Sequence, residues 1–308
     1  MTDRTTLALA AAVFCGALVA VQARVNGELA TSLHDALLAA VVSFGSGLVV
    51  IAALVLARSS ARQAWGRLRH VPWWTRLGGL GGATLVAAGA YAAPRIGVAL
   101  LTVGIVAGQT TGGLLIDRAG LGPGGRHAVT PSRLAGALLC IAAVVLSVAG
   151  KGRGDAHAPL LAVVVAAGLL ISLQQALNGR VRAHTGDAGV TTLVNFLVGT
   201  TALVVAYLLF SLHDVRHWPG PGHWWLYIGG SLGVLFIAMA AVTVRILGVL
   251  RLGLATVAGQ LVGAVALDVA APASGHGVAV ATVVGVVLTF VAVGISGRAA
   301  STAPAVPS

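Results

Sequence analysis

Charged side chains are scarce in this chain of 308 residues. Only 9% of its residues are Asp, Glu, Lys or Arg, against about 25% in a typical soluble domain. Hydrophobic residues make up 57% of the chain, and the mean hydropathy is +0.96. A water-soluble protein of this length needs a charged surface that this sequence does not supply. The composition therefore predicts an integral membrane protein.

Residues that carry catalytic or metal chemistry are also few. Cys15 and Cys140 are the two cysteines, and both lie inside apolar segments, where we expect small core residues instead of a disulfide framework or a metal site. The nine histidines lie in loops or at segment edges without metal-ligand spacing. The glycines of Gly78–Gly82 and Gly120–Gly125 lack the strand–turn–helix context of a phosphate loop. We therefore expect no enzyme, no metal and no cofactor.

The net charge of +11 is compatible with a nucleic-acid partner only if the basic residues share a soluble face. They lie instead between apolar runs, where they act as topology signals near anionic lipid headgroups. We expect the bilayer as partner and no nucleic acid, and the sequence leaves the oligomeric state open.

Long apolar runs fill most of the chain, and each is about as long as a helix that crosses 30 Å of hydrocarbon. Unpaired backbone groups are costly in lipid, so each run is predicted to be a helix. The first run, around Leu7–Ala23, is long for the core of a signal peptide, and we interpret it as the first span. The sequence predicts an all-α membrane protein of ten transmembrane helices, at residues 5–24, 36–57, 77–93, 96–116, 133–150, 159–177, 188–211, 224–244, 248–269 and 278–296.

An internal repeat divides these helices into two sets of five. A shift of 152 residues superposes six positions, of which the rare Gln and Asn carry the most weight: Gly16, Gln22, Asn26, Gly27, Phe44 and Gly47 on Gly168, Gln174, Asn178, Gly179, Phe196 and Gly199. After a loop deletion of one residue the shift is 151, and it superposes Trp73, Trp74, Gly78, Gly79, Gly82, Gly97, Gly108, Gln109, Gly112 and Asp117 on Trp224, Trp225, Gly229, Gly230, Gly233, Gly248, Gly259, Gln260, Gly263 and Asp268. We expect a first repeat at 1–150, a second at 151–298, and a disordered cytoplasmic tail at 299–308.

Five helices per repeat is an odd number, so the two repeats are predicted to have opposite orientations in the bilayer. Placing the N-terminus in the cytoplasm puts 14 of the 19 Lys and Arg residues inside and 5 outside. The positive-inside rule then favours both termini in the cytoplasm of a multi-pass cell-membrane protein.

The repeated motifs also resemble a known family. In the first repeat they are VAVQARVNGELA (Val19–Ala30), SFGSG (Ser43–Gly47), WWTRLGGLGG (Trp73–Gly82) and VAGQTTGGLLIDRAGL (Val106–Leu121). In the second they are SLQQALNGRV (Ser172–Val181), NFLVGT (Asn195–Thr200), WWLYIGG (Trp224–Gly230) and VAGQLVGAVALD (Val257–Asp268). The chain resembles the YdcZ-type transporters of the drug/metabolite transporter superfamily, in a fused ten-helix form. The resemblance implies transport without naming a substrate.

One departure from the wider superfamily concerns the first helix. Small multidrug resistance proteins carry a membrane-embedded glutamate there, which binds protons or cationic drugs. This chain has Gln22 and Asn26 instead, and its nearest acid, Glu28, lies at or beyond the predicted membrane edge. The difference argues against proton-coupled export of hydrophobic cations.

Polar side chains inside the predicted spans are candidates for the site, because each needs a partner or a water-filled cavity in lipid. Gln22 and Asn26 are four residues apart on one helical face, and Gln174 and Asn178 repeat this arrangement. We expect inverted repeats to bring the two pairs towards a shared interface near the midplane, where neutral amides offer donors and acceptors to a polar, uncharged or zwitterionic solute. The alternative is that these amides only join helices.

Other polar positions are open to both interpretations. Gln109 and Gln260 each follow a glycine in mid-helix, and Ser43 and Asn195 precede repeated phenylalanines; each either packs between helices or lines the site. The Trp73–Trp74 and Trp224–Trp225 pairs are predicted interface anchors. Asp117 and Asp268 end two helices, where a carboxylate opposes the helix dipole. We expect gating or loop-fixing roles for them, with Arg118 and Arg216 as candidate partners.

Together these features favour a secondary transporter that moves a small molecule by alternating access. The alternatives are a passive channel and a non-transporting partner subunit or sensor. A channel needs a continuous polar pore, and the few polar residues here cluster near one interface.

Overall fold

The computed structural model describes residues 3–122, 125–126, 129–149, 157–211, 221–271 and 280–301. Every regular element within these segments is helical. Within the described part of the chain, five helices are long and apolar enough to cross a membrane, at Arg4–Leu33, Ala36–Leu56, Val98–Ala119, Ala158–Thr185 and Ala188–Phe210. Shorter apolar stretches occur at Leu134–Leu146, Ala255–Ala270 and Val283–Ala292. The prediction of an all-helical membrane protein is confirmed, and the number of ten spans stays a prediction.

Among the described residues, the first half contains six α-helices and the 3-10 helices η1 (Leu68–His70) and η2 (Trp73–Gly78). The α-helices are α1 (Asp3–Leu33), α2 (Ala36–Leu56), α3 (Ser59–Arg67), α4 (Gly79–Ile96), α5 (Val98–Ala119) and α6 (Pro131–Ala149). Asp35 caps α2, because its carboxylate accepts the N–H of Leu38 at 3.0 Å. Gly97 separates α4 from α5 and has a φ of +79°, a conformation that side chains disfavour.

The second half contains α7 (His157–Thr185), α8 (Ala188–Phe210), α9 (Gly229–Ala270) and α10 (Val280–Ser301). Asp187 caps α8 as Asp35 caps α2, by accepting the N–H of Val190 at 3.0 Å. The helix α10 passes the expected boundary at 298 and continues to Ser301. The rest of the predicted tail lies outside the described residues.

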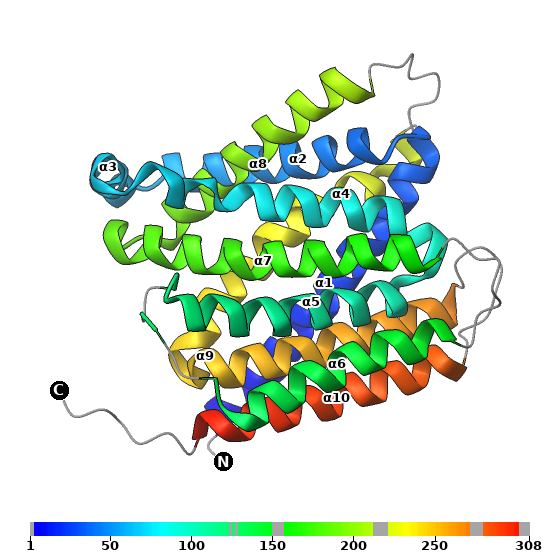
Figure 1. Ribbon diagram of the computed structural model, residues 1–308. Helices are drawn as coiled ribbons and strands as arrows, with labels where there is room; N and C mark the ends of the chain where they lie inside the picture. Colours follow the sequence, from blue (N-terminus) through cyan, green and yellow to red (C-terminus); the bar gives the residue numbers. More distant parts are fainter. Residues whose placement is uncertain are drawn as a thin grey trace.

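One element differs from the expected pair of helices at 224–244 and 248–269. The structure assigns a single α-helix of 42 residues, α9, which would be about 63 Å long if straight, twice the hydrocarbon thickness. The chain nevertheless reverses within it. Its first arm runs antiparallel to α1, because Gly229 faces Asn26 and the later Gly233 faces the earlier Gln22. Its second arm runs parallel to α1, because Gly259 faces Val13 and Gly263 faces Ala17. The predicted break is therefore wrong as a helix end but marks a reversal between two arms (Figure 1).

The basic loop after α2 contains structure that the hydropathy pattern did not indicate. The nine residues of α3 place Ala61 and Ala64 in the core together with Leu68, three and four residues apart on one face. Their partners include Val55 and Val190 in the same apolar cluster. A basic segment therefore packs on the bundle through a small apolar stripe.

The helix connections gather at two ends of the bundle (Figure 1). We call one the α3 end, which carries α3 and the α5–α6 and α7–α8 connections. We call the other the Gly97 end, which carries the α1–α2 and α4–α5 connections. This division agrees with the sides that the charge count assigned to these connections.

The two halves are packed crosswise about a pair of equivalent phenylalanines. The rings of Phe44 and Phe196 lie 5.1 Å apart between centroids. Phe196 covers Gly47, and Phe44 covers the equivalent Gly199. On either side, α1 packs against α9 of the other half, and α7 packs against α4 and α5 of the first. Equivalent helix contacts thus recur in the two halves.

Candidate substrate site

A first polar cluster lies where α1 and α2 meet the start of α9. Gln22 donates a hydrogen bond from Nε2 to the carbonyl oxygen of Gly229 at 2.8 Å. Asn26 and Ser43 are each 2% exposed. Both face Gly229, which has no room for a Cβ because the amide oxygen of Asn26 occupies that place. Glycine therefore lets the opposite half approach these polar groups closely.

A second cluster repeats this arrangement where α7 and α8 meet the start of α4. The amide of Asn178 donates from Nδ2 to Oδ1 of Asn195 at 2.9 Å. A Cβ at Gly78 would lie 2.6 Å from Oδ1 of Asn178, and one at Gly82 would lie 2.7 Å from Oε1 of Gln174. Each amide pair expected from the sequence thus meets glycines of the other half, and no recorded hydrogen bond joins the two pairs within the described residues.

Buried oxygens without a partner are concentrated in these clusters. Among the described residues, six buried side-chain N or O atoms lack a hydrogen bond, and three belong to expected site residues: Oδ1 of Asn26, Oγ of Ser43 and Oε1 of Gln174. Buried polar atoms are usually paired. These three leave acceptor capacity for a polar molecule at the crossings of the two halves.

The two other glutamines lie further along the same crossings. The backbone oxygen of Gln109 accepts the hydroxyl of Ser172 at 2.8 Å, between α5 and α7. Gln260 is 6% exposed, and its backbone N would lie 2.6 Å from a Cβ at Gly16, between α9 and α1. The recorded contacts of both residues are helix-packing contacts of the backbone.

Asp268 holds the α4–α5 turn. Its carboxylate accepts the N–H groups of Val98 at 2.9 Å and Ala99 at 2.7 Å, and the side chain is buried. The partners of this acid are thus two backbone donors at the start of α5, where the helix dipole favours a negative charge. The expected partner Arg216 lies outside the described residues.

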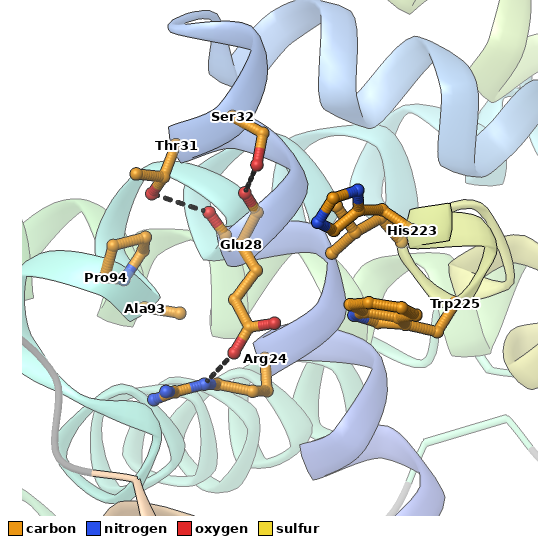
Figure 2. Close-up of a pocket in the computed structure, with 10 residues that line it drawn as sticks. Arg24, Glu28, Thr31, Ser32, Ala93, Pro94, His223 and Trp225 are labelled. Carbon is orange, nitrogen blue, oxygen red and sulfur yellow. Dashed lines mark hydrogen bonds and ion pairs between the residues drawn. The ribbon is translucent and has the colours of Figure 1, made fainter. Parts of the chain in front are cut away.

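A cavity of about 510 Å³ opens at the Gly97 end, beside the first cluster. Its wall combines the last turns of α1, the end of α4 and the short 3-10 helix η3 (Pro221–Tyr227). Figure 2 shows its charged residues, Arg24 and Glu28, between Pro94 on one side and Trp225 on the other. Nε of Arg24 and Oε1 of Glu28 form an ion pair at 2.7 Å.

The α3 end is held together by arginines. Arg180 donates to the carbonyl oxygens of Leu121 at 2.7 Å and Gly120 at 2.8 Å. Arg67 donates to the carbonyl oxygen of Thr185 at 2.9 Å. Arg58 and Asp187 form an ion pair at 2.7 Å. These contacts tie together α3 and the α5–α6 and α7–α8 connections.

Arg24 and the position of Trp225 in the cavity wall were not expected from the sequence. The tryptophan pairs were expected at the membrane interface, and Trp73 and Trp224 are 71% and 65% exposed. Trp225 is 39% exposed and faces the cavity. The spacing of Arg24 and Glu28, four residues apart in a helix that outlasts its apolar run, is the signal that points to this pair.

Comparisons with known proteins bear on the whole chain. The model of the family described as "Putative inner membrane exporter, YdcZ" matches twice, at residues 7–146 and 159–295. A solved structure described as "Crystal structure of protein" is similar over 98% of this chain and 99% of that chain, with a TM-score of 0.57 and 22% identity, which supports the fold alone. The curated proteins contain no match.

Proposed function

The chain belongs to the YdcZ family of membrane transporters, and we propose that it is a secondary transporter that moves a small polar molecule across the cell membrane by alternating access. The proposal includes ten spans, two inverted repeats at 1–150 and 151–298, and both termini in the cytoplasm. The family description names a transporter, which is not an enzyme class. It leaves mechanism and substrate to be proposed.

One observation carries the proposal: the two ends of the bundle differ. The Gly97 end opens into a cavity beside the first polar cluster, while at the α3 end the contacts of Arg180 and Arg67 and the Arg58–Asp187 pair join the described helix connections. A carrier needs states in which one end is open and the other is closed. The charge count puts the open end outside, so this conformation corresponds to an outward-facing state.

The crosswise packing supports a movement between two such states. Each half contributes amides that rest on glycines of the other half, so a rotation about the Phe44–Phe196 contact would uncover one cluster as it covers the other. Inverted-repeat transporters alternate by rocking one repeat against the other around a site near the midplane.

The proposed binding groups are the side chains of the two clusters, with acceptor capacity on Asn26, Ser43 and Gln174. Gln22, Asn178 and Asn195 complete the clusters with amide groups that are both donors and acceptors. Gln109 and Gln260 belong to the proposed site as flanking residues. The sequence has no nucleotide-binding motif, so the energy comes from a gradient of solute or ion.

Counterflow in liposomes tests this function. Purified protein is reconstituted, the liposomes are loaded with each unlabelled solute of a panel, and uptake of the same labelled solute is followed. A carrier gives a transient accumulation above equilibrium, whereas a channel gives only passive equilibration. We expect accumulation for at least one small polar solute, with a strong loss in Gln22→Ala and in Gln174→Ala.

The matched control is Gln63→Ala, which removes an exposed amide on α3. It should transport like the unmodified protein. Equilibration without accumulation would favour a channel. Unchanged counterflow in both cluster variants would exclude the two clusters as the binding site.

A further inference from the structure

We propose that the cavity at the Gly97 end binds a small zwitterion, with its cationic group between Glu28 and the ring of Trp225 and its carboxylate on the guanidinium of Arg24. The inference rests on the proposed function and deepens it by naming a solute class. It concerns binding, which is measured without transport.

The cavity offers opposite charges on one wall. Arg24, Gly27, Glu28 and Thr31 lie along one face of the last turns of α1. A volume of about 510 Å³ falls in the range of small-molecule pockets. The hydroxyls of Thr31 and Ser32 donate to carbonyl oxygens of their own helix. The charged pair therefore dominates the polar chemistry of this wall.

The ion pair uses only part of each charged group. Nε of Arg24 contacts Oε1 of Glu28, and within the described residues no acceptor is recorded for the terminal nitrogens of the guanidinium. Figure 2 shows these nitrogens on the side of Ala93 and Pro94, and the second oxygen of Glu28 on the side of Trp225. The side chains are 20% and 45% exposed. A carboxylate and an ammonium group thus have separate, oppositely charged places to bind.

The Arg24–Glu28 pair is also weak enough to yield to a ligand. Both residues lie on one helix at i and i+4, with the cation first, which is the less favourable order for the helix dipole. Partly exposed pairs of this kind contribute little to stability. A ligand that supplies both charges replaces one pair by two charge-assisted contacts.

The α3 end of the molecule contains a cation–tryptophan contact at the position equivalent to the proposed one. The repeat superposes Glu28 on Arg180 and Trp225 on Trp74. At the α3 end, the guanidinium of Arg180 lies 5.3 Å from the centre of the Trp74 ring. The protein's own cation therefore covers the tryptophan at the α3 end. At the Gly97 end the equivalent residue is an acid, so a cation brought by a ligand fits against Trp225 and Glu28.

The anionic contact has no such counterpart. The repeat superposes Arg24 on Ala176, so an arginine at this position is specific to the first half. Its charge makes the cavity suited to a zwitterion instead of a simple cation. The cavity lies next to the first cluster, because its wall residue Gly27 follows Asn26 in α1.

The experiment measures ligand affinity of the purified full chain from its thermal shift in detergent. Two matched series serve as probes: phenylalanine, phenethylamine and 3-phenylpropionate, and leucine, 3-methylbutylamine and 4-methylpentanoate. We expect the zwitterion of at least one series to bind about tenfold more tightly than its amine or its acid. Arg24→Gln should abolish the preference for the zwitterion over the amine, and Glu28→Gln the preference over the acid.

Arg95→Gln is the control, because Arg95 lies at the same end but stacks on Tyr91 outside the cavity wall. It should keep the preference. If Glu28→Gln does not fold, Trp225→Ala tests the same contact and should weaken the amine more than the acid. The inference is overturned if neither series shows a preference for the zwitterion, or if Arg95→Gln loses that preference as fully as Arg24→Gln does. Counterflow of other solutes would then leave the proposed function intact, whereas zwitterion binding without any counterflow would refute the function alone.

Discussion

Glycines at the helix crossings determine how closely the two halves approach. Gly79 faces the carbonyl oxygen of Asn195, and its added Cβ would also lie 2.8 Å from the backbone N of Gly199. Both neighbours are backbone atoms, which cannot move aside as a flexible side chain does. In contrast, a Cβ at Gly113 meets nothing within 4 Å. The same residue type therefore has different constraints at these two positions.

We expect Gly79→Ala to destabilise the protein by about 1–3 kcal/mol, the usual range for an overpacked core. Gly113→Ala should be neutral or stabilising, because alanine favours a helix. The measurement is the apparent melting temperature of each purified variant in detergent. Equal melting temperatures for the two variants would show that the α4–α8 contact is looser than described.

Asp268 has a stabilising role that is open to a direct test. Asp268→Ala leaves the buried N–H groups of Val98 and Ala99 without their acceptor, and we expect a loss of about 1–3 kcal/mol. Asp268→Asn keeps an acceptor oxygen, so its stability should lie between those of the unmodified protein and Asp268→Ala. Asp35→Ala is the control, since Asp35 accepts a single N–H at a partly exposed cap. A larger loss in thermal stability for Asp35→Ala would contradict this ranking.

At the scale of elements, the proposed closure of the α3 end depends on the contacts of Arg180 with Gly120 and Leu121. Two hydrogen bonds from a charged donor contribute about 1.5–3 kcal/mol each, enough to shift a closing equilibrium at least tenfold. We expect Arg180→Ala to raise the rate at which a thiol reagent labels Ala176→Cys, because Ala176 lies one turn away and is only 7% exposed.

The labelling experiment uses a background without Cys15 and Cys140, which are both buried. A membrane-impermeant maleimide is added to inverted vesicles. Arg69→Ala is the control, because Arg69 is exposed and its recorded partner is His70. If Arg180→Ala and Arg69→Ala label at the same rate, then Arg180 does not close this end.

Hydropathy and the repeat predicted most elements, but not their partners. The expected span at 36–57 agrees with α2, and the span at 188–211 agrees with α8, because apolar length and an aspartate cap coincide at both. The expected first helix ended near 24, whereas α1 continues to Leu33. A helix can continue beyond its apolar run, because its backbone hydrogen bonds do not depend on lipid. The last turns of α1 therefore place Arg24 and Glu28 in the cavity wall.

In the candidate site, too, the residues could be predicted from the sequence but their partners could not. The sequence indicated the amides through their duplication, and the structure places them against glycines of the opposite half. Which half each pair faces depends on crosswise packing between distant segments, and no local pattern encodes it. The partners of Asp268 were also missed, because backbone N–H groups leave no signature in a sequence, whereas arginines do.

At the scale of the whole molecule, the orientation in the membrane is a prediction that an experiment can test directly. The count of 14 Lys and Arg residues inside and 5 outside favours a single orientation with the α3 end in the cytoplasm. Gly122 and Gly222 are a matched pair for testing it. An added Cβ meets nothing within 4 Å at either position. Gly122 lies in the α5–α6 connection and Gly222 in η3.

In the cysteine-free background, an impermeant maleimide should label Gly222→Cys in intact cells and Gly122→Cys only in inverted vesicles. The reverse pattern would place the cavity in the cytoplasm and make this conformation inward-facing. Labelling of both cysteines in intact cells would mean that the chain inserts in both orientations. That result would contradict the charge asymmetry, since a bias of nearly three to one leaves little reason for half of the chains to place the basic α3 end outside. A single orientation would instead fix the direction from which a solute reaches Arg24 and Glu28.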